Sequence, residues 1–325
     1  MRTVSAMSRL EVRPLTADDL PEAAALLAER HRRHRSAQPL LPPRYENAAE
    51  SAACLPTLDE ASGAAAYRDG KMVAYVLGAP KANPVWGPNI WVETAGTAAT
   101  EPEAVRDAYA AAATRWVDEG NTAHYVLVPA TDPDVVRAWF RLGFGQQHAH
   151  AIRDVASAVS PLPPGVTIRR AERSDIPMLA FLEVALPQHH GTAPTFSAGV
   201  IPTIEESRKE WEDDFDDESY TTFVAVRDGE VIGSAVGCAL EKSSSHTGLA
   251  RPDNAGFLGF AAVHPACRGS GAGRALGEAV LSWAGSAGFS SVVTDWRVTN
   301  LQSSRAWPAL GFSETFLRLH RLIAY

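Results

Sequence analysis

The sequence predicts an α/β protein with mixed α+β sheets, built from two related domains in tandem. Three observations support this. Apolar runs with strand-like alternation are interleaved with helical patterns along the chain. The order of motifs in the first half recurs in the second. The stretch 255–288 has the pattern of a strand, a glycine-rich turn and a helix.

Length and composition narrow the class of protein. With 325 residues, 46% of them hydrophobic, the chain is long enough for two cores. No apolar run has the ~20 residues of a membrane helix, and the N-terminus lacks the apolar core of a secretion signal, so we expect a cytoplasmic protein without a membrane partner. A net charge of −8 argues against a general affinity for nucleic acid. Three widely spaced cysteines predict neither a disulfide framework nor a metal site.

The first half predicts alternating strands and helices. Asp69-Gly70 marks a hairpin turn, and the basic tail 31–35 is either a solvated helix end, which we favour, or an anion site. The expected elements are strand 10–15, helix 20–33, hairpin 64–67 and 71–77, strand 90–94, helix 101–118, strand 124–128 and helix 134–140.

The second half repeats these motifs after a proline-rich linker. Arg13 matches Arg169, Asp69-Gly70 matches Asp228-Gly229, and the Leu-Gly-Phe ending at Phe144 matches the one ending at Phe312. The offsets are 169 − 13 = 156, 228 − 69 = 159 and 312 − 144 = 168. We therefore predict an N-terminal domain at 1–156, a linker at 157–165 and a C-terminal domain at 166–325.

The stretch 255–288 carries the strongest functional signal. After the predicted strand 257–263, Pro265 and the loop 268–273 lead into a helix from Ala272. Three glycines let backbone N–H groups at the helix N-terminus approach a ligand, which favours a pyrophosphate cradle. Neither the Walker loop nor the dinucleotide fingerprint has this spacing.

The corresponding helix of the first half lacks such a loop. Thr100 and Glu103 have capping-box spacing, and the carboxylates of Glu101 and Glu103 would repel a pyrophosphate. The sequence therefore predicts that only the second domain binds a phosphorylated cofactor.

The pattern Val263, Pro265, Arg268, Gly271 and Gly273 resembles the coenzyme A loop of the GNAT N-acetyltransferase superfamily. The order of elements resembles the GNAT fold in both halves, and the layout is similar to that of tandem members such as mycothiol synthase. No residue selects that reaction.

The resemblance implies that acetyl-CoA is the cosubstrate and that a primary amine attacks its thioester directly. The cofactor's arm would lie along the strand 257–263, where Gly259 suggests a bulge or a close backbone approach. An N–H near Ala262 or Val263 would polarise the thioester carbonyl. The residues expected to bind the cofactor are Ala261, Ala262, Val263, Arg268, Gly269, Ser270, Gly271, Ala272, Gly273, Arg274, Asn300 and Ser303.

The acid and the base are less well defined by the sequence. Many family members carry a tyrosine where this chain has Trp307, so water or Ser303 would have to protonate the leaving thiolate. The candidate catalytic bases are Asp295 and His264, with the pair His189 and His190 as further candidates. Each of the four also fits a purely structural role.

The resemblance also implies that the acidic stretch 210–218 borders the acceptor site, where Trp211 and Phe215 of this stretch and the nearby Tyr220 would form a wall. The stretch would attract a cationic amine, although such charge runs usually form a solvated face. The acceptor is a small-molecule or peptide amine, and a monomer or a homodimer is expected. Direct transfer needs no nucleophilic thiol, so Cys267 is expected to be an ordinary loop residue. The alternative function is non-catalytic binding or sensing of acyl-CoA.

Overall fold

The computed structural model describes residues 9–82, 84–155, 160–197 and 199–324, and its helices and mixed sheets confirm the predicted α/β class. The chain divides into two compact units. Unit 1 comprises 1–147, 247–250 and 315–325, and unit 2 comprises 148–246 and 251–314. Residues 157–159 of the predicted linker lie outside the described residues.

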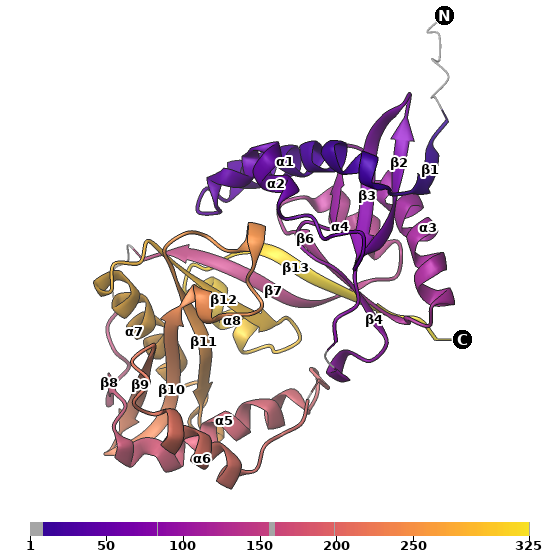
Figure 1. Ribbon diagram of the computed structural model, residues 1–325. Coiled ribbons are helices and arrows are strands. Elements are labelled where there is room, and N and C mark those ends of the chain that lie inside the picture. Colours follow the sequence, from indigo (N-terminus) through magenta and orange to yellow (C-terminus); the bar gives the residue numbers. More distant parts are fainter. Residues whose placement is uncertain (1–8, 83, 156–159, 198, 325) are drawn as a thin grey trace, which may run out of the picture. The chain divides into compact units, whose positions relative to one another are not determined.

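Unit 1 contains the antiparallel sheet β1-β2-β3-β5 and the strands β4, β6 and β13. Helix α3 packs on β2 and β3, and α1 packs on β5 (Figure 1). The elements are β1 (Glu11–Pro14), α1 (Leu20–Ala37), α2 (Ala48–Ala52), β2 (Ser62–Arg68), β3 (Lys71–Gly78), β4 (Asn89–Val92), β5 (Thr97–Ala99), α3 (Ala104–Asp118), β6 (Ala123–Pro129), α4 (Pro133–Phe140) and β13 (Ser313–Leu322).

Unit 2 contains a sheet in the order β7-β12-β11-β10-β9-β8. Only the pair β11 and β12 is parallel. The elements are β7 (Gly145–Asp154), β8 (Val166–Arg170), α5 (Ile176–His190), α6 (Ile204–Asp214), β9 (Tyr220–Arg227), β10 (Glu230–Ala239), β11 (Ala255–Val263), α7 (Ala272–Ser286), β12 (Ser291–Arg297) and α8 (Ser303–Ala309).

The two units exchange their last strands, which the predicted domain boundaries do not include. Strand β7, at the end of the first half of the sequence, pairs with β12 of unit 2 from His148 to Asp154. Strand β13, at the end of the second half, pairs with β6 of unit 1 from Phe316 to Leu322. Each sheet is therefore completed by a strand from the other half of the sequence.

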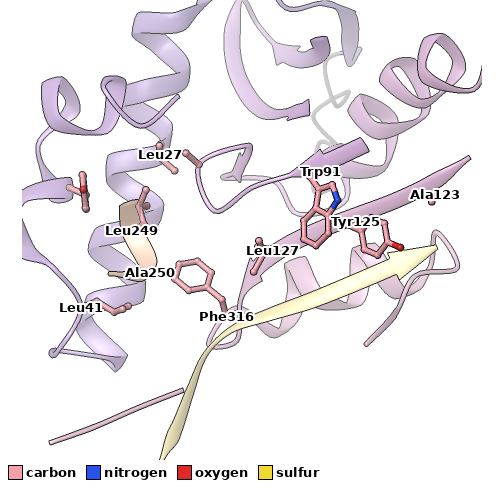
Figure 2. Packing of buried hydrophobic residues seen from close by; sticks show 11 residues of the cluster. Leu27, Leu41, Trp91, Ala123, Tyr125, Leu127, Leu249, Ala250 and Phe316 are labelled. Carbon is pink, nitrogen blue, oxygen red and sulfur yellow. The ribbon is translucent and has the colours of Figure 1, made fainter. Parts of the chain in front are cut away.

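The core of unit 1 shows that β13 is an integral part of it. The ring of Phe316 is fully buried together with Leu127 of β6, Leu249 and Ala250 (Figure 2). Each large apolar side chain buried in this way contributes about 2 kcal/mol relative to an exposed one. The exchanged strand is therefore held by packing as well as by its ladder.

Local geometry confirms the internal repeat. The Arg13 guanidinium lies 2.7 Å from the Asp19 carboxylate, and its counterpart Arg169 lies 2.6 Å from Asp175. Both hairpins turn through an Asp-Gly pair with positive φ, at 69–70 and 228–229. The glycines of both Leu-Gly-Phe segments, Gly143 and Gly311, also have positive φ.

Helices α7 and α5 cover opposite faces of the sheet of unit 2. A Cβ on Gly237 of β10 would lie 2.7 Å from the Trp283 ring of α7, whereas the neighbouring Val236 shares a cavity with Glu183 of α5. Because adjacent residues of a strand face opposite sides, these contacts place the two helices on different faces. Among the described residues, no helix combines the length and apolarity needed to span a membrane.

Two predicted helix boundaries were wrong. Helix α3 begins at Ala104, and no capping box forms because Thr100 continues the pairing with β3, its amide donating to Val73 O at 2.9 Å. The first helix also continues past Arg33, to Ala37.

Helix α6 was not predicted, although Thr203 and Glu206 have capping-box spacing and form that motif.

Candidate active site

The central feature of unit 2 is a gap between two strands. Strand β11 pairs with β12 only over Ala255–Leu258, and the Thr294 hydroxyl donates to Leu258 O at 2.9 Å where the pairing ends. Beyond this point β11 pairs with β10 and β12 with β7. The two parallel strands thus separate and leave an opening between residues 259–263 and 295–297.

A bulge at Gly259 accompanies the separation, as the sequence predicted. The register between β10 and β11 shifts after Val236, which pairs with Phe260, while Gly237 pairs with Leu258, so Gly259 has no counterpart. A Cβ at Gly259 would lie 2.8 Å from the Phe257 ring, which makes glycine the residue that fits here. Bulges of this kind re-aim backbone groups beside functional sites.

Backbone amides face the gap. The His264 N–H donates to Ile232 O at 2.8 Å, which fixes which residues of β11 bond to β10. Since bonding alternates along an antiparallel ladder, the amides of Ala261 and Val263 face away from β10. The amide of Ala262 faces β10, so of the two amides considered from the sequence only that of Val263 faces the opening.

Three cavities follow one another along β11 and share residues. The wide cavity, about 640 Å³, is lined by Phe257, Gly259 and Phe260 of this strand. The gap cavity, about 150 Å³, is lined by 258–261, and the helix-side cavity, about 100 Å³, by 261–263. The cavities are therefore adjacent and follow β11 in order, from the wide cavity to the residues Arg268 and Gly273 of the glycine loop.

The loop before α7 has the geometry expected of an anion cradle. Gly269 and Gly271 have φ of 80° and 83°, a region that favours glycine. Within the ranges that the structure describes, the N–H groups of Gly269, Gly271, Gly273 and Arg274 have no hydrogen-bond acceptor. Unpaired amides at a helix N-terminus carry partial positive charge and bind phosphate oxygens.

The end of the linker lies against this loop. A fourth cavity, about 330 Å³, lies between Gly269–Gly271 and the linker residues Ser160 and Pro163. The Arg274 guanidinium donates to Ser160 Oγ at 2.6 Å and to Glu278 Oε1 at 3.1 Å. A Cβ on Gly271 would lie 2.8 Å from Pro163, so bulk at this position meets the linker.

The residues predicted to bind the cofactor fall into two groups. The helix-side cavity is lined by Ala261, Ala262, Val263, Arg268, Gly273, Asn300 and Ser303, and the loop cavity by Gly269, Ser270, Gly271 and Arg274. Ala272 is buried as the first residue of α7, so only its amide is near the loop. Asn300 accepts from the amides of Gln302 and Ser303 at 3.1 and 3.5 Å, and its Nδ2 lies 3.3 Å from His190 Nε2.

Asp295, one of the two predicted bases, lines the gap cavity. Its Oδ1 lies 3.6 Å from Nε2 of His148 on β7, and its Oδ2 lies 3.6 Å from Nε2 of the fully buried His246. Burial lowers the pKa of His246 to about 3, so this ring is neutral at pH 7. Sequence reasoning missed His148, because no motif marks it and its strand belongs to the other half of the chain.

The other predicted bases occupy different positions. His264 precedes a 3-10 turn, its Nδ1 accepts from the Ala266 amide at 3.3 Å, and its ring stacks on Phe181, outside the lining of the described cavities. His189 lines the helix-side cavity with Arg268, and His190 the gap cavity. Burial and then the charge of Arg297 lower the pKa of His190 to about 4.

Trp307 and Ser303 line both the gap cavity and the helix-side cavity. Both belong to α8, and the indole of Trp307 is buried. The indole only donates a hydrogen bond through its nitrogen and does not release that proton near neutral pH, whereas the Ser303 hydroxyl can both donate and accept.

The wide cavity is acidic and aromatic. Its carboxylates are Glu183 of α5 with Glu210, Asp214 and Asp217 of the acidic stretch, against the cations Arg170 and Lys242. The aromatic lining is Trp211, Phe215, Tyr220, Phe257 and Phe260. Other carboxylates of the same stretch pair outwards, Asp213 with Lys209, Glu212 with Arg208 and Asp216 with Arg173. The acidic stretch therefore has one side in the cavity and one in solvent.

No three His, Cys, Asp or Glu side chains within the described part of the chain are arranged as metal ligands. Cys238 lines the wide cavity, where burial raises the pKa of its thiol to about 11, so it stays protonated at neutral pH. Cys267 accepts a hydrogen bond from Arg227 at 3.2 Å.

Comparison with known sequences gives a family match in the second half of the chain and a relative that matches part of the chain. A model of the acetyltransferase (GNAT) family matches residues 188–312, which include the glycine loop and Asn300. The aminoglycoside N(6')-acetyltransferase type 1 of Stenotrophomonas maltophilia is 32% identical over 118 residues, 36% of this chain and 75% of that protein.

Comparison with solved structures extends the likeness of fold to both halves. The GCN5-related N-acetyltransferase from Sphaerobacter thermophilus has a TM-score of 0.57 at 15% identity and covers 97% of this chain and 96% of its own. A glucosamine N-acetyltransferase region of a fungal multi-domain β-N-acetylglucosaminidase has a TM-score of 0.52 at 14% identity, over 98% of this chain and 38% of that one. At these identities the likeness shows the fold alone.

Proposed function

Because the chain belongs to the GNAT family of acetyltransferases and is therefore an acyltransferase, we propose that it transfers an acetyl group from acetyl-CoA to a primary amine of a small cationic molecule. The observation that carries this proposal is the row of adjacent cavities along β11, from an acidic cavity through the strand gap to a glycine loop with unpaired amides, which we call the path. A donor and an acceptor can enter this path from opposite ends.

The donor half of the path suits acetyl-CoA. The pyrophosphate would bind the unpaired amides of the loop 268–274, and the pantetheine arm would lie beside residues 261–263. Asn300 and Ser303 would donate to its amide carbonyls. The amides of Ala261 and Val263 face the opening and can bond to the carbonyl oxygen of the thioester as negative charge develops there.

The acceptor half of the path suits a molecule with several positive charges. Four carboxylates outnumber two cationic side chains in the wide cavity, and aromatic faces offer stacking surfaces for rings or ammonium groups. The S. maltophilia relative is named for acetylating an aminoglycoside, a class with this chemistry. We propose an aminoglycoside-like or polyamine acceptor rather than a neutral amine.

The reaction proceeds by direct attack in a ternary complex. The uncharged amine attacks the thioester carbon, a C–N bond forms, the C–S bond breaks, and the thiolate leaves. A thiol with a pKa of roughly 8.5 is a good leaving group, so Ser303 or water can supply its proton. The amine must first lose a proton, because an alkylammonium ionises only near pH ~10.

The test is release of free CoA from acetyl-CoA with kanamycin, spermidine or a lysine peptide as the amine. We expect kanamycin or spermidine to raise the rate at least about tenfold over the rate without amine. Asp214→Asn removes a carboxylate of the wide cavity, whereas Asp213→Asn removes a neighbouring carboxylate that faces Lys209 outside it. The KM for the cationic amine should rise several-fold in Asp214→Asn and stay unchanged in Asp213→Asn. The rise should be smaller at high salt, because salt screens the attraction between the charges. Equal effects of both variants would contradict the acceptor assignment.

The second candidate is non-catalytic binding of acyl-CoA. Trp307 favours it, because this indole occupies the position where many family members have an acidic tyrosine. Acetyl-CoA binding without amine-dependent CoA release for any of the amines would support this alternative and overturn transfer.

A further inference from the structure

The reaction centre of unit 2 includes side chains from the first half of the chain. Strand β7 pairs with the edge of β12 that is opposite to β11, so His148 lies opposite Arg297 and His150 opposite Asp295. Of the two histidines, His148 lines the gap cavity together with Asp295. The exchange of strands therefore brings an imidazole to the edge of the opening.

The hydrogen bonds around His246 define how Asp295 is held. Ser243 Oγ accepts from the Ser245 amide at 3.3 Å and lies 2.8 Å from His246 Nδ1. Because the neutral His246 ring has its Nε2 facing a carboxylate oxygen, the tautomer with the proton on Nε2 avoids repulsion between lone pairs, and Nδ1 then accepts from the Ser243 hydroxyl. That Nε2–H faces Asp295 Oδ2 at 3.6 Å.

The second oxygen of Asp295 is directed to His148. Its Oδ1 lies 3.6 Å from His148 Nε2, long for a hydrogen bond but within the range in which catalytic pairs stand before substrate binds. A carboxylate at this distance stabilises an imidazolium. Asp295 thus lies between a neutral histidine that orients it and a second histidine at the cavity.

We propose that Asp295 and His148 together form the proton-accepting pair of the acetyl transfer, with His246 as a positioning residue, so that the catalytic centre of unit 2 depends on a strand from the first half of the chain. This inference rests on the function proposed above. The acceptor ammonium gives one proton to the pair, which holds it between Asp295 Oδ1 and His148 Nε2. The freed nitrogen lone pair then attacks the thioester carbon. The product nitrogen loses its second proton to water, and the departing thiolate takes up one.

The gap cavity is also the place where the donor and acceptor halves of the path meet. It shares Gly259 and Phe260 with the wide cavity, and Ala261, Ser303 and Trp307 with the helix-side cavity. An amine nitrogen that reaches the thioester must pass this point. Proton removal by the pair therefore occurs where attack takes place.

The other charged or titratable groups around the pair are His150, His190, His246 and Arg297. His190 and His246 are neutral at pH 7, because burial lowers the pKa of His190 to about 4 and that of His246 to about 3. The ring of His150 contacts that of His246, with centroids 4.4 Å apart and an angle of 47° between the ring planes, and it does not line the gap cavity. Arg297 is a permanent cation that favours the ionised carboxylate.

The first experiment measures kcat and KM against pH for the full chain, with the most active of kanamycin and spermidine as the amine. His148→Gln and Asp295→Asn should each lower kcat about 100-fold with acetyl-CoA affinity within threefold of the unchanged protein. The rising limb of the kcat/KM profile should move to lower pH in His148→Gln, since a lone carboxylate ionises near pH ~4. A structural role alone would lower the rate without moving this limb.

The matched control is His320→Gln on β13, the exchanged strand of unit 1, which should leave kcat within twofold. If His148→Gln behaves like this control, the proposal is overturned. Circular dichroism and acetyl-CoA binding verify that each variant is folded.

The second measurement does not depend on an acceptor. Titration of the histidine rings by NMR in the full chain should show that Asp295→Asn lowers the pKa of the His148 ring by at least about one unit. An unchanged value contradicts the pair. If neither amine reacts but this shift is observed, the proposed acceptors are wrong while the pair stands.

Discussion

The two units share one design but differ at the point where their central strands separate. In unit 2, Leu186 of α5 lines the open gap cavity and helix-side cavity. In unit 1, the repeat offset 175 − 19 = 156 makes Arg30 of α1 the counterpart of Leu186. The buried Arg30 guanidinium donates to Thr94 O at 2.6 Å and also to the carbonyl of Thr97, the first residue of β5.

The N-termini of α7 in unit 2 and α3 in unit 1 also differ, the first being open to a ligand and the second not. In unit 2, α7 begins after a glycine loop whose amides have no acceptor among the residues that the structure describes. In unit 1, Glu101 and Glu103 precede α3 and pair with arginines, Glu101 with Arg68 at 2.8 Å. The first amides of α3 also donate to backbone carbonyls, as that of Ala104 does to Glu101 O at 3.0 Å, so these amides are paired, unlike those of the glycine loop in unit 2. The difference teaches that a shared fold can be a binding site in one copy and a scaffold in the other.

The largest expected effect tests the loop of unit 2. Gly269→Glu places a carboxylate among the unpaired amides, and we expect acetyl-CoA to bind more than 100-fold more weakly because like charges repel in the cradle. Gly288→Glu is the matched control at the other end of α7. Both glycines have positive φ, 80° and 86°, and a Cβ on either meets no atom within 4 Å. Calorimetric titration of both variants decides the matter, and equal affinities would refute the cradle.

The next prediction concerns Arg30, which occupies in unit 1 the position that Leu186 has in unit 2. Arg30→Leu gives unit 1 the residue found in unit 2 and leaves two carbonyls without their charged donor. We expect a loss of about 3 kcal/mol in the free energy of unfolding, measured with urea. Burial lowers the pKa of Arg30 to about 10, so the cation is held against its desolvation by these carbonyls. A variant as stable as the parent would show that Arg30 does not close the unit.

A smaller effect compares the repeated Arg–Asp pairs. Asp19 accepts from Arg13 and also from the Tyr67 hydroxyl at 2.7 Å, whereas Asp175 pairs with Arg169. We expect Asp19→Asn to cost about 1 kcal/mol more than Asp175→Asn, for the extra buried hydrogen bond. Urea midpoints at pH 7 give the difference.

The pairs also predict how stability changes with pH. Hydrogen bonding to arginine holds the pKa of both carboxyls below the ordinary value, so their stabilisation is present above pH ~4 and is lost as pH falls towards the folded-state pKa. The cost of either Asn variant should therefore shrink at pH 3. A cost independent of pH would rule out the ionised pair as its origin.

The smallest effect concerns the acidic helix start of unit 1. Glu101→Gln should leave the affinity for acetyl-CoA within twofold, because unit 1 does not bind the cofactor, and should cost less than 1 kcal/mol for a partly exposed ion pair. A large loss of affinity in calorimetry would assign a cofactor site to unit 1.

Much of this contrast could be predicted from the sequence, because it depends on local rules. The glycine loop, the bulge at Gly259 and the Arg-Asp and Asp-Gly repeats follow from residue type and spacing. The Thr100 capping box failed because pairing with β3 overrides a local cap.

The exchange of β7 and β13 could not be predicted. Both strands follow a Leu-Gly-Phe bend, and which sheet each one completes depends on tertiary packing, such as that of Phe316. For the same reason His148 could not be recognised beside Asp295. Its partner is 147 positions away in sequence (295 − 148 = 147) and no spacing rule connects them.

The most direct test of the account is the number of acetyl-CoA molecules bound by the full chain, measured by calorimetry. The account predicts one site per chain, lost in Gly269→Glu and kept in Gly288→Glu, Arg30→Leu and Glu101→Gln. Two sites, or one site that survives Gly269→Glu, would contradict the assignment of binding to unit 2 and of a scaffold to unit 1.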